Sequence, residues 1–168
     1  MLKINQLISG YGSVQILNGA NMKVEKQSIV ALLGGNGTGK STILRAASGL
    51  IRSWKGTIEF NGEQIQNLPA HEIVGRGLMS NPKMIMLDEP SAALAPQIVL
   101  DIFKNINRIR QDGLTVLVVE QNVRMALLLA DYGYVIKDGV INVEGDSKKL
   151  MYDESVKESY LGGTKANV

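Results

Sequence analysis

The chain has 168 residues, of which 45% are hydrophobic and 20% are charged, with a net charge of +2 and no cysteine. This composition is typical of one soluble globular domain, and it excludes a disulfide scaffold, a thiolate metal site and a cysteine nucleophile. The balanced charge gives no support for nucleic-acid binding, and no apolar run is long enough to cross a bilayer, so we expect no direct membrane insertion.

The first 50 residues predict paired strands, a buried strand and a helix. Residues 2–7 and 21–25 alternate apolar and polar side chains, as expected of half-buried antiparallel partners. Residues 29–33 are all apolar, which is typical of a central strand buried on both faces. A glycine-rich loop follows at residues 34–39, and residues 41–50 predict a helix.

The rest of the chain alternates strands and helices. Strands are predicted at residues 56–60, 84–87, 114–119, 132–137 and 140–144, and helices at residues 68–74, 96–112, 122–130 and 147–161. This alternation predicts an α/β fold with a mostly parallel central sheet, and the antiparallel segments at both ends predict a smaller β layer beside it. We interpret residues 1–168 as a single domain.

Two features are assigned no chemistry. The residues Ile98, Ile102, Phe103, Ile106 and Ile109 are spaced for one face of a helix, and we expect that face to belong to the core. His71 is the only histidine and lies away from every motif, so we interpret it as a solvated residue on a helix.

The glycine-rich loop carries the most specific motif in the chain. The pattern G-x-x-x-x-G-K-[ST] is matched in full by Gly34, Gly35, Asn36, Gly37, Thr38, Gly39, Lys40 and Ser41. Such a loop directs backbone N–H groups at phosphate oxygens, and the following helix adds its positive end. Lys40 would neutralise the β- and γ-phosphates, Ser41 would bind Mg²⁺, and Thr42 would contact the α-phosphate. The motif therefore predicts a nucleotide site.

Two carboxylates follow the predicted strand at residues 84–87. In P-loop proteins an aspartate at the end of such a strand holds the magnesium ion, and Asp88 fits this role. Glu89 is placed to polarise an attacking water as general base. A solvated strand end would be the simpler interpretation of an isolated Asp-Glu pair. The upstream phosphate loop favours the catalytic interpretation.

Together these segments resemble the ATP-binding subunit of ABC transporters, a P-loop NTPase with a RecA-like core. The resemblance rests on residues 34–42, 87–91 and 138–139, and it extends over nearly the whole chain. The subgroup that serves branched-chain amino acid importers, the LivF-like proteins, is the most similar. Residues 91–96, 119–122 and 160–163 resemble its loop after the acidic pair, its switch region and its C-terminal ending.

This resemblance implies further roles. Tyr11 stands where the family has an aromatic side chain that stacks on adenine, although an ordinary turn tyrosine is the alternative. Gln121 stands at the switch position, where a glutamine can donate a hydrogen bond toward the γ-phosphate but cannot become cationic. A simple polar residue at a helix N-terminus is the alternative. Residues 92–95 resemble the D-loop, although most members have an aspartate in place of Ala95.

The family pattern is interrupted between Val74 and Leu78. Residues 68–74 resemble the helix before the Q-loop, and residues 77–83 resemble the end of the helix after the LSGGQ motif. The Q-loop, the helical subdomain and LSGGQ are missing between them. Either the native protein contains a segment that this sequence omits, or the chain is truly short. The residues do not separate these explanations.

The resemblance therefore implies an ATP-hydrolysing subunit of an importer, with ATP and Mg²⁺ as ligands. Its partners would be transmembrane permease subunits and a second ATPase subunit, at the cytoplasmic face of the membrane and without nucleic acid. The first alternative is a nucleotide-binding core with little or no turnover. A kinase or GTPase is disfavoured because the chain has no guanine-reading N-K-x-D motif. A DNA-repair ATPase is disfavoured because there is no basic stripe.

Overall fold

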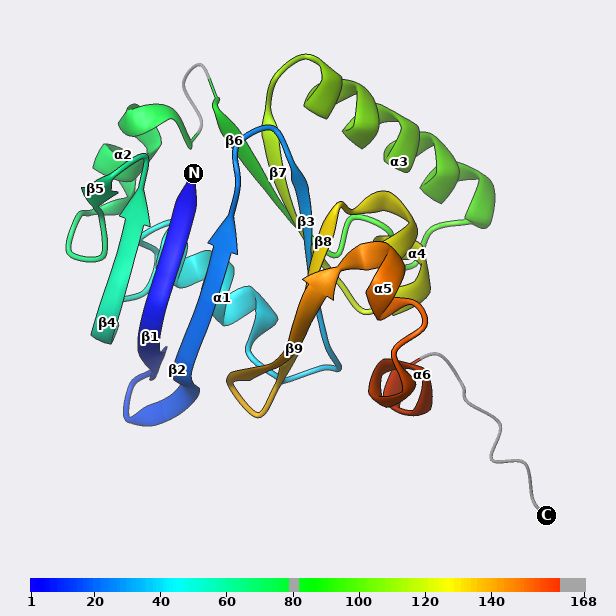
Figure 1. The fold of residues 1–168 in the computed structure, drawn as a ribbon. Coiled ribbons are helices and arrows are strands. Elements are labelled where there is room, and N and C mark those ends of the chain that lie inside the picture. Colours follow the sequence, from blue (N-terminus) through cyan, green and yellow to red (C-terminus); the bar gives the residue numbers. More distant parts are fainter. Residues whose placement is uncertain (79–81, 161–168) are drawn as a thin grey trace.

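Two β-sheets lie side by side with helix α1 between them (Figure 1). The computed structural model describes residues 1–78 and 82–160. The antiparallel sheet has the order β2-β1-β4-β5, with β1 at Leu2–Tyr11, β2 at Val14–Val24, β4 at Ser53–Phe60 and β5 at Glu63–Gln64. This is the predicted small β layer, and it lies beside the parallel sheet. Its strands all come from residues 2–64, so the expectation that the C-terminal hairpin (predicted at residues 132–137 and 140–144) also belongs to it is wrong, because that hairpin pairs within the parallel sheet.

The second sheet is parallel except at one edge. Its order is β6-β7-β3-β8-β9, with β6 at Met84–Asp88, β7 at Thr115–Glu120, β3 at Ile29–Leu33, β8 at Tyr132–Lys137 and β9 at Val140–Asp146. Only β9 runs antiparallel to its neighbour. Every residue of β3 and β7 is buried, as the apolar runs predict for central strands. The predicted α/β fold is therefore confirmed.

Helices cover both faces of the parallel sheet. Helix α1 at Lys40–Ala47 packs in the core between the two sheets, and short α2 at Ala70–Ile73 continues into a π-helix, η1, at Val74–Leu78. The other face carries α3 at Pro96–Gln111, α4 at Val123–Leu129, α5 at Ser147–Leu150 and α6 at Glu154–Tyr160. Each face of the sheet thus has its own apolar core, and the carboxyl ends of β3, β6 and β7 meet at one edge.

The two sheets are joined through Tyr134 of β8. Its hydroxyl donates to the Lys23 carbonyl and accepts from the Lys23 N–H of β2, both at 3.0 Å. Burial raises the pKa of Tyr134 to about 12. At the tip of the β8–β9 hairpin, the Asn18 N–H donates to the Gly139 carbonyl at 2.9 Å and the Asn18 side chain donates to the Asp138 carbonyl at 2.8 Å. These bonds fix β2 against the hairpin.

Strand β6 forms the opposite edge of the parallel sheet. It pairs with β7, and no other strand in the described residues pairs with it. Its three central residues are only partly buried, whereas β7 beside it is buried throughout. Residues 84–87 of β6 are all apolar, as are all residues of β3, so the difference in burial lies in what surrounds the strand rather than in the type of its side chains.

Some predicted elements differ from the structure. The N-terminal hairpin is longer than the alternation indicated, because β2 already begins at Val14 and irregular register shifts interrupt its pairing with β1. Strand β4 begins at Ser53, before the predicted start at residue 56. The helix predicted at residues 68–74 has only one α-helical turn, Ala70–Ile73, before the π-helix.

The predicted C-terminal helix is in fact two short helices. The Asp146 carboxylate accepts from the N–H groups of Lys148 and Lys149 and begins α5, and Asp153 accepts from the Val156 N–H and begins α6. Because each aspartate starts a new helix, the chain turns between them. Residues 161–168, including the end of the predicted helix and of the family-like ending, lie outside the described residues.

The apolar stripe of α3 is only partly in the core. Phe103 and Ile106 are buried against β7, and Ile102 and Ile109 pack at their margin. Ile98 is 51% exposed, so the expectation that the whole stripe is core is wrong at this residue. Ile98 lies in the first turn of α3, where the side chain is not covered by the sheet.

Candidate nucleotide site

The phosphate loop leaves the carboxyl end of β3 and enters α1. Gly39 has a φ of +109°, a conformation that glycine adopts readily and that lets the loop turn into the helix. A Cβ atom at Gly34 would lie 2.5 Å from the Ile136 carbonyl oxygen, so β8 packs too closely for any larger residue there. The Gly139 N–H donates to the Thr38 carbonyl at 3.1 Å. The loop is therefore held by the β8–β9 hairpin.

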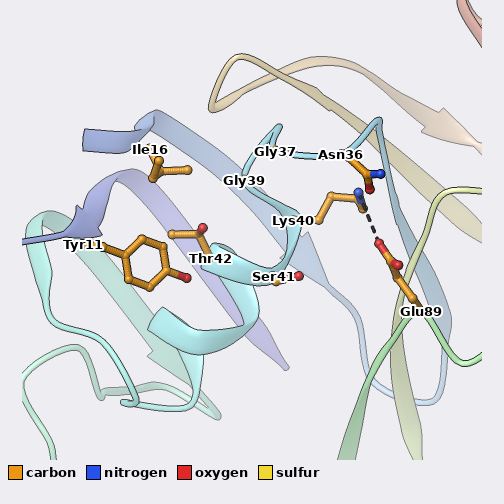
Figure 2. Close-up of a pocket in the computed structure, with 9 residues that line it drawn as sticks. All are labelled: Tyr11, Ile16, Asn36, Gly37, Gly39, Lys40, Ser41, Thr42 and Glu89. Carbon is orange, nitrogen blue, oxygen red and sulfur yellow. Dashed lines mark ion pairs between the residues drawn. The ribbon is translucent and has the colours of Figure 1, made fainter. Parts of the chain in front are cut away.

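Lys40 lies at the centre of the site. It is 4% exposed, and its Nζ donates to the Gly35 carbonyl at 2.8 Å. The same Nζ lies 3.6 Å from a carboxylate oxygen of Glu89 (Figure 2). A buried ammonium group needs such partners because its charge is otherwise removed from water. The phosphate loop and the end of β6 thus meet at one cation.

The acidic pair contacts both the phosphate loop and the switch segment. Asp88 accepts a hydrogen bond from the Ser41 hydroxyl at 3.1 Å, and Glu89 accepts one from the Gln121 side-chain amide at 2.7 Å. Glu89 has a φ of +48°, a conformation that is uncommon for residues other than glycine. Its N–H donates to the Val119 carbonyl at 2.9 Å, which holds this backbone against the end of β7. Such a backbone is a common feature of functional sites.

The phosphate loop and Glu89 lie beside a cavity of about 230 Å³. It is lined by Tyr11, Ile16, Asn36, Gly37, Gly39, Lys40, Ser41, Thr42 and Glu89. Figure 2 shows Tyr11 and Ile16 on one side of the start of α1, and Asn36, Lys40 and Glu89 on the other. The cavity therefore has an aromatic and aliphatic end, contributed by the antiparallel sheet, and a charged end, contributed by the parallel sheet.

Magnesium ligands can be tested on the chemistry of the donors. No group of three or more His, Cys, Asp or Glu residues that could enclose a metal occurs in residues 1–78 and 82–160. Ser41 and Asp88 nevertheless lie together, as a hydroxyl and a carboxylate oxygen 3.1 Å apart. Mg²⁺ in nucleotide sites uses one or two protein carboxylates and completes its shell with phosphates and waters. The pair fits an ion brought in with a nucleotide.

Two side chains contribute to the site although no motif assigns them a role. Glu120 is 2% exposed, and its carboxylate accepts from the Ser91 N–H at 3.0 Å, which holds the loop after Glu89. A charged residue at the end of an apolar strand was the available signal. Arg45 donates to the Tyr11 hydroxyl at 3.1 Å, and its guanidinium lies 5.8 Å from the centre of the ring. Arg45 lies one turn after Ser41, but nothing in the sequence indicates its partner.

Known proteins resemble this chain over nearly its whole length. A family model described as ABC transporter matches residues 17–77. The chain is 30% identical to the high-affinity branched-chain amino acid transport ATP-binding protein BraG of Pseudomonas aeruginosa, over 97% of this chain and 100% of the relative. It is 28% identical to the lipopolysaccharide export system ATP-binding protein LptB of Haemophilus influenzae, over 96% and 97% of the two chains.

The alignment with the Pseudomonas relative is longer than this chain. It spans 233 positions, whereas the chain has only 168 residues. The relative therefore contains dozens of residues that have no counterpart here. The match to the family model stops at residue 77, inside the interval where the sequence pattern is interrupted.

Solved structures show the same fold. A nucleotide-free ATP-binding cassette from an ABC transporter superposes with a TM-score of 0.83 at 22% identity, over 96% of this chain and 99% of that chain. A dimeric cassette bound to ADP and Pi superposes with a TM-score of 0.76 at 18% identity, over 88% and 99% of the chains. No helix in the described part of this chain is long and apolar enough to span a membrane.

Proposed function

Because the chain belongs to the family of ABC transporter ATP-binding proteins, we propose that its cavity binds ATP with Mg²⁺ and that the site is built to hydrolyse ATP. The observation that carries this proposal is the convergence of Lys40, Asp88 and Glu89 on the start of α1. Two separate segments of sequence supply these residues, and only the fold brings them together.

Each end of the cavity would hold one part of the nucleotide. The loop N–H groups and Lys40 would hold the β- and γ-phosphates, while Thr42 would reach the α-phosphate. Ser41 and Asp88 would hold Mg²⁺, which screens phosphate charge when it is bound. Tyr11 is 39% exposed, so its ring is accessible for stacking on adenine. The hydrogen bond from Arg45 to Tyr11 would then orient the ring.

Glu89 would act on the attacking water. Its carboxylate would take a proton from that water as the oxygen attacks the γ-phosphorus, and the bond to the β-γ bridging oxygen would break. In the structure Lys40 and Gln121 both contact this carboxylate. A γ-phosphate would compete with Glu89 for Lys40, which would release the carboxylate for the water. Gln121 would keep it oriented and extend toward the γ-phosphate.

The partners follow from the family but not from the cavity. We propose that the parent protein works with transmembrane permease subunits and a second ATPase subunit at the cytoplasmic face of the membrane. A dimeric cassette among the similar structures supports the pairing of two such domains. Import of branched-chain amino acids is supported by the similarity to BraG and by residues 91–96 and 119–122. The lipopolysaccharide export relative shows that this similarity is not confined to amino-acid transport.

For the chain of 168 residues alone we propose ATP·Mg binding with little or no turnover. The long alignment with the Pseudomonas relative and the end of the family match at residue 77 support a single domain with an internal gap near residues 74–78. From the sequence resemblance we expect the Q-loop and the LSGGQ motif to be the segments missing there. Without them two copies would not complete each other's sites, and charge stabilisation from across the dimer would be lost.

Titration with ATP and Mg²⁺ by calorimetry tests this proposal. Lys40→Ala should weaken binding by about 100-fold or more, because a charged partner of two phosphates is lost from a buried position. Lys104→Ala is the matched control, since Lys104 is an exposed lysine on α3 that pairs with Asp101. Equal affinity of the Lys40 variant and the control would exclude the site. Steady release of phosphate by the unmodified chain would contradict the second part of the proposal.

A further inference from the structure

Three consecutive residues at the end of β7 hold the segment that carries Glu89. The Val119 carbonyl accepts from the Glu89 N–H at 2.9 Å, and the Gln121 side-chain amide donates to the Glu89 carboxylate at 2.7 Å. Between them in the sequence, the Glu120 carboxylate accepts from the Ser91 N–H at 3.0 Å. Two of these bonds reach Glu89 itself, and the third holds the loop two residues later.

The Glu120 side chain lies on the face of the sheet that is covered by α3 and α4. Successive residues of a strand point to opposite faces. Val116 and Val118 of β7 belong to the core beneath α3 and α4, whereas its odd-numbered residues Leu117 and Val119 belong to the core around α1. Glu120 continues the even-numbered series and does not line the nucleotide cavity. It can therefore act on the site only through the loop that it contacts.

The charge of Glu120 is costly to bury. The residue is only 2% exposed, and a carboxylate removed from water needs hydrogen bonds or a cation in exchange. Within residues 1–78 and 82–160 no lysine, arginine or histidine forms an ion pair with it. The Ser91 N–H donates to it, and such a bond is stronger than one to a neutral acceptor. The buried carboxylate is thus committed to the loop.

This loop has an uncommon backbone. Glu89 has a φ of +48° and Ala93 has a φ of +58°, in the left-handed region that residues other than glycine rarely adopt. The Ala92 N–H donates to the Glu89 carbonyl at 3.0 Å, so the turn begins at Glu89 itself. Such a conformation persists only where surrounding contacts fix it. Ser91 lies between the two left-handed residues, so its bond to Glu120 fixes the middle of the turn.

We propose that Glu120 is a positioning residue for the general base. By holding Ser91 it fixes Glu89, whose carboxylate then stays 3.6 Å from the Lys40 ammonium nitrogen (Figure 2). This inference rests on the proposed function, in which Glu89 acts on the attacking water. A fixed Glu89 lies beside the place that the γ-phosphate would occupy, and the like charges repel each other. Glu120 should therefore lower the affinity for ATP relative to ADP.

The side-chain amide of Gln121 reports the position of Glu89 in the nucleotide-free chain. Its signals in nitrogen–proton correlation NMR spectra, assigned by their loss in Gln121→Leu, should differ from those of exposed glutamines because of the bond to Glu89. Glu120→Leu should move these signals toward the positions of exposed glutamines. Glu120→Gln should leave them nearly in place, because it keeps an acceptor for the Ser91 N–H.

Thr115→Val is the matched control. Thr115 is buried at the other end of β7, and its hydroxyl accepts from the Gln27 N–H at 2.9 Å. The substitution removes the same kind of bond from the same strand, but far along the sequence from Glu89. It should lower the stability of the chain and leave the Gln121 signals unchanged.

Calorimetric titration with ATP·Mg and with ADP·Mg measures the effect on the site. Glu120→Leu should raise the ratio of ATP affinity to ADP affinity by about threefold or more, because a released Glu89 no longer opposes the γ-phosphate. In a Glu89→Gln background the same substitution should not change the ratio, since the charge through which Glu120 acts is already absent. A chain that binds neither nucleotide would refute the proposed ATP site, and the Gln121 signals alone would then decide on Glu120.

Three outcomes would overturn the proposal. One is that Glu120→Leu leaves the Gln121 signals in place. Another is an equal movement of these signals in Thr115→Val, because the response would then report a general loosening of β7. The third is an affinity ratio that Glu120→Leu leaves unchanged or alters equally with and without the Glu89 carboxylate. The proposed binding of ATP would stand in each of these cases.

Discussion

At one edge of the parallel sheet, the β8–β9 hairpin is hydrogen-bonded to β2 of the antiparallel sheet. The bonds come from the Tyr134 hydroxyl and from the backbone N–H and side-chain amide of Asn18. At the other edge β6 has one strand partner and half-buried side chains. Strand β8, inside the hairpin, is buried along most of its length, whereas β6 is only half-buried. The difference teaches that burial here depends on what covers an edge, and that the two edges should respond differently to the same change.

The largest effect is expected from truncating one isoleucine in β8, the inner strand of the hairpin, and one in β6, the edge strand on the other side of the sheet. Ile136→Ala in β8 should lower the free energy of unfolding by about 2–5 kcal/mol, because the side chain is fully buried. Ile85→Ala in β6 should cost about 1 kcal/mol or less, since Ile85 is only partly buried. Urea unfolding measures both. Equal losses would show that the β6 edge is packed as tightly as the closed one.

The second comparison uses two hairpin glycines with positive φ. A Cβ atom at Gly139 would lie 2.0 Å from the Ile16 carbonyl oxygen, whereas one at Gly62 would meet nothing within 4 Å. Gly62→Ala should therefore cost about 1–2 kcal/mol, from its left-handed backbone alone. Gly139→Ala should cost about 2 kcal/mol more, because the hairpin must move away from β2. Similar losses in urea unfolding would mean that the hairpin does not press on β2.

A smaller effect is expected at the Tyr134 junction. Burial raises the pKa of Tyr134 to about 12 from an ordinary value of 10.0. The folded state therefore favours the protonated phenol, and its contribution is complete below pH 10 and is lost as the pH rises toward 12. Tyr134→Phe should lower stability by about 1 kcal/mol at pH 7, through two lost hydrogen bonds. It should also flatten the decline above pH 10. An unchanged alkaline decline in thermal unfolding would remove Tyr134 as its cause.

The smallest effect is a difference in amide hydrogen exchange along β6, which can be measured in the unmodified chain. Within β6, the N–H groups of Met86 and Asp88 face the open side, while those of Ile85 and Leu87 face β7. Amide hydrogen exchange followed by NMR should therefore be faster at Met86 and Asp88. Uniform slow exchange along β6 would contradict an open edge.

Much of the fold could be predicted from the sequence because local signals agree with each other there. The apolar run at residues 29–33, the glycine-rich loop and the following helix each indicate the same strand-loop-helix unit, and the structure contains it. The tail was harder, because Asp146 and Asp153 each begin a helix and only the folded chain shows the turn between them.

The site was predictable where residue types carry the chemistry. The motifs named Lys40, Asp88, Glu89 and Gln121, and the fold brings them together, although their roles remain predictions. Contacts across the fold were not predictable. No periodicity indicates that Arg45 meets the Tyr11 hydroxyl or that Glu120 holds the Ser91 N–H. Nor does the sequence of β6 show that, in the described residues, it pairs with a strand on one side only, because strand order in a sheet depends on contacts between distant segments.

The Tyr134 junction has a consequence for the size of ligand that the cavity accepts. Tyr11 and Ile16 belong to the antiparallel sheet, whereas Lys40 follows a strand of the parallel sheet. Because the Tyr134 hydroxyl joins the two sheets, the distance between the aromatic end and the ammonium group is set by the fold rather than by the ligand. A molecule must therefore be long enough to reach from Tyr11 and Ile16 to Lys40 in order to contact both ends of the cavity at once.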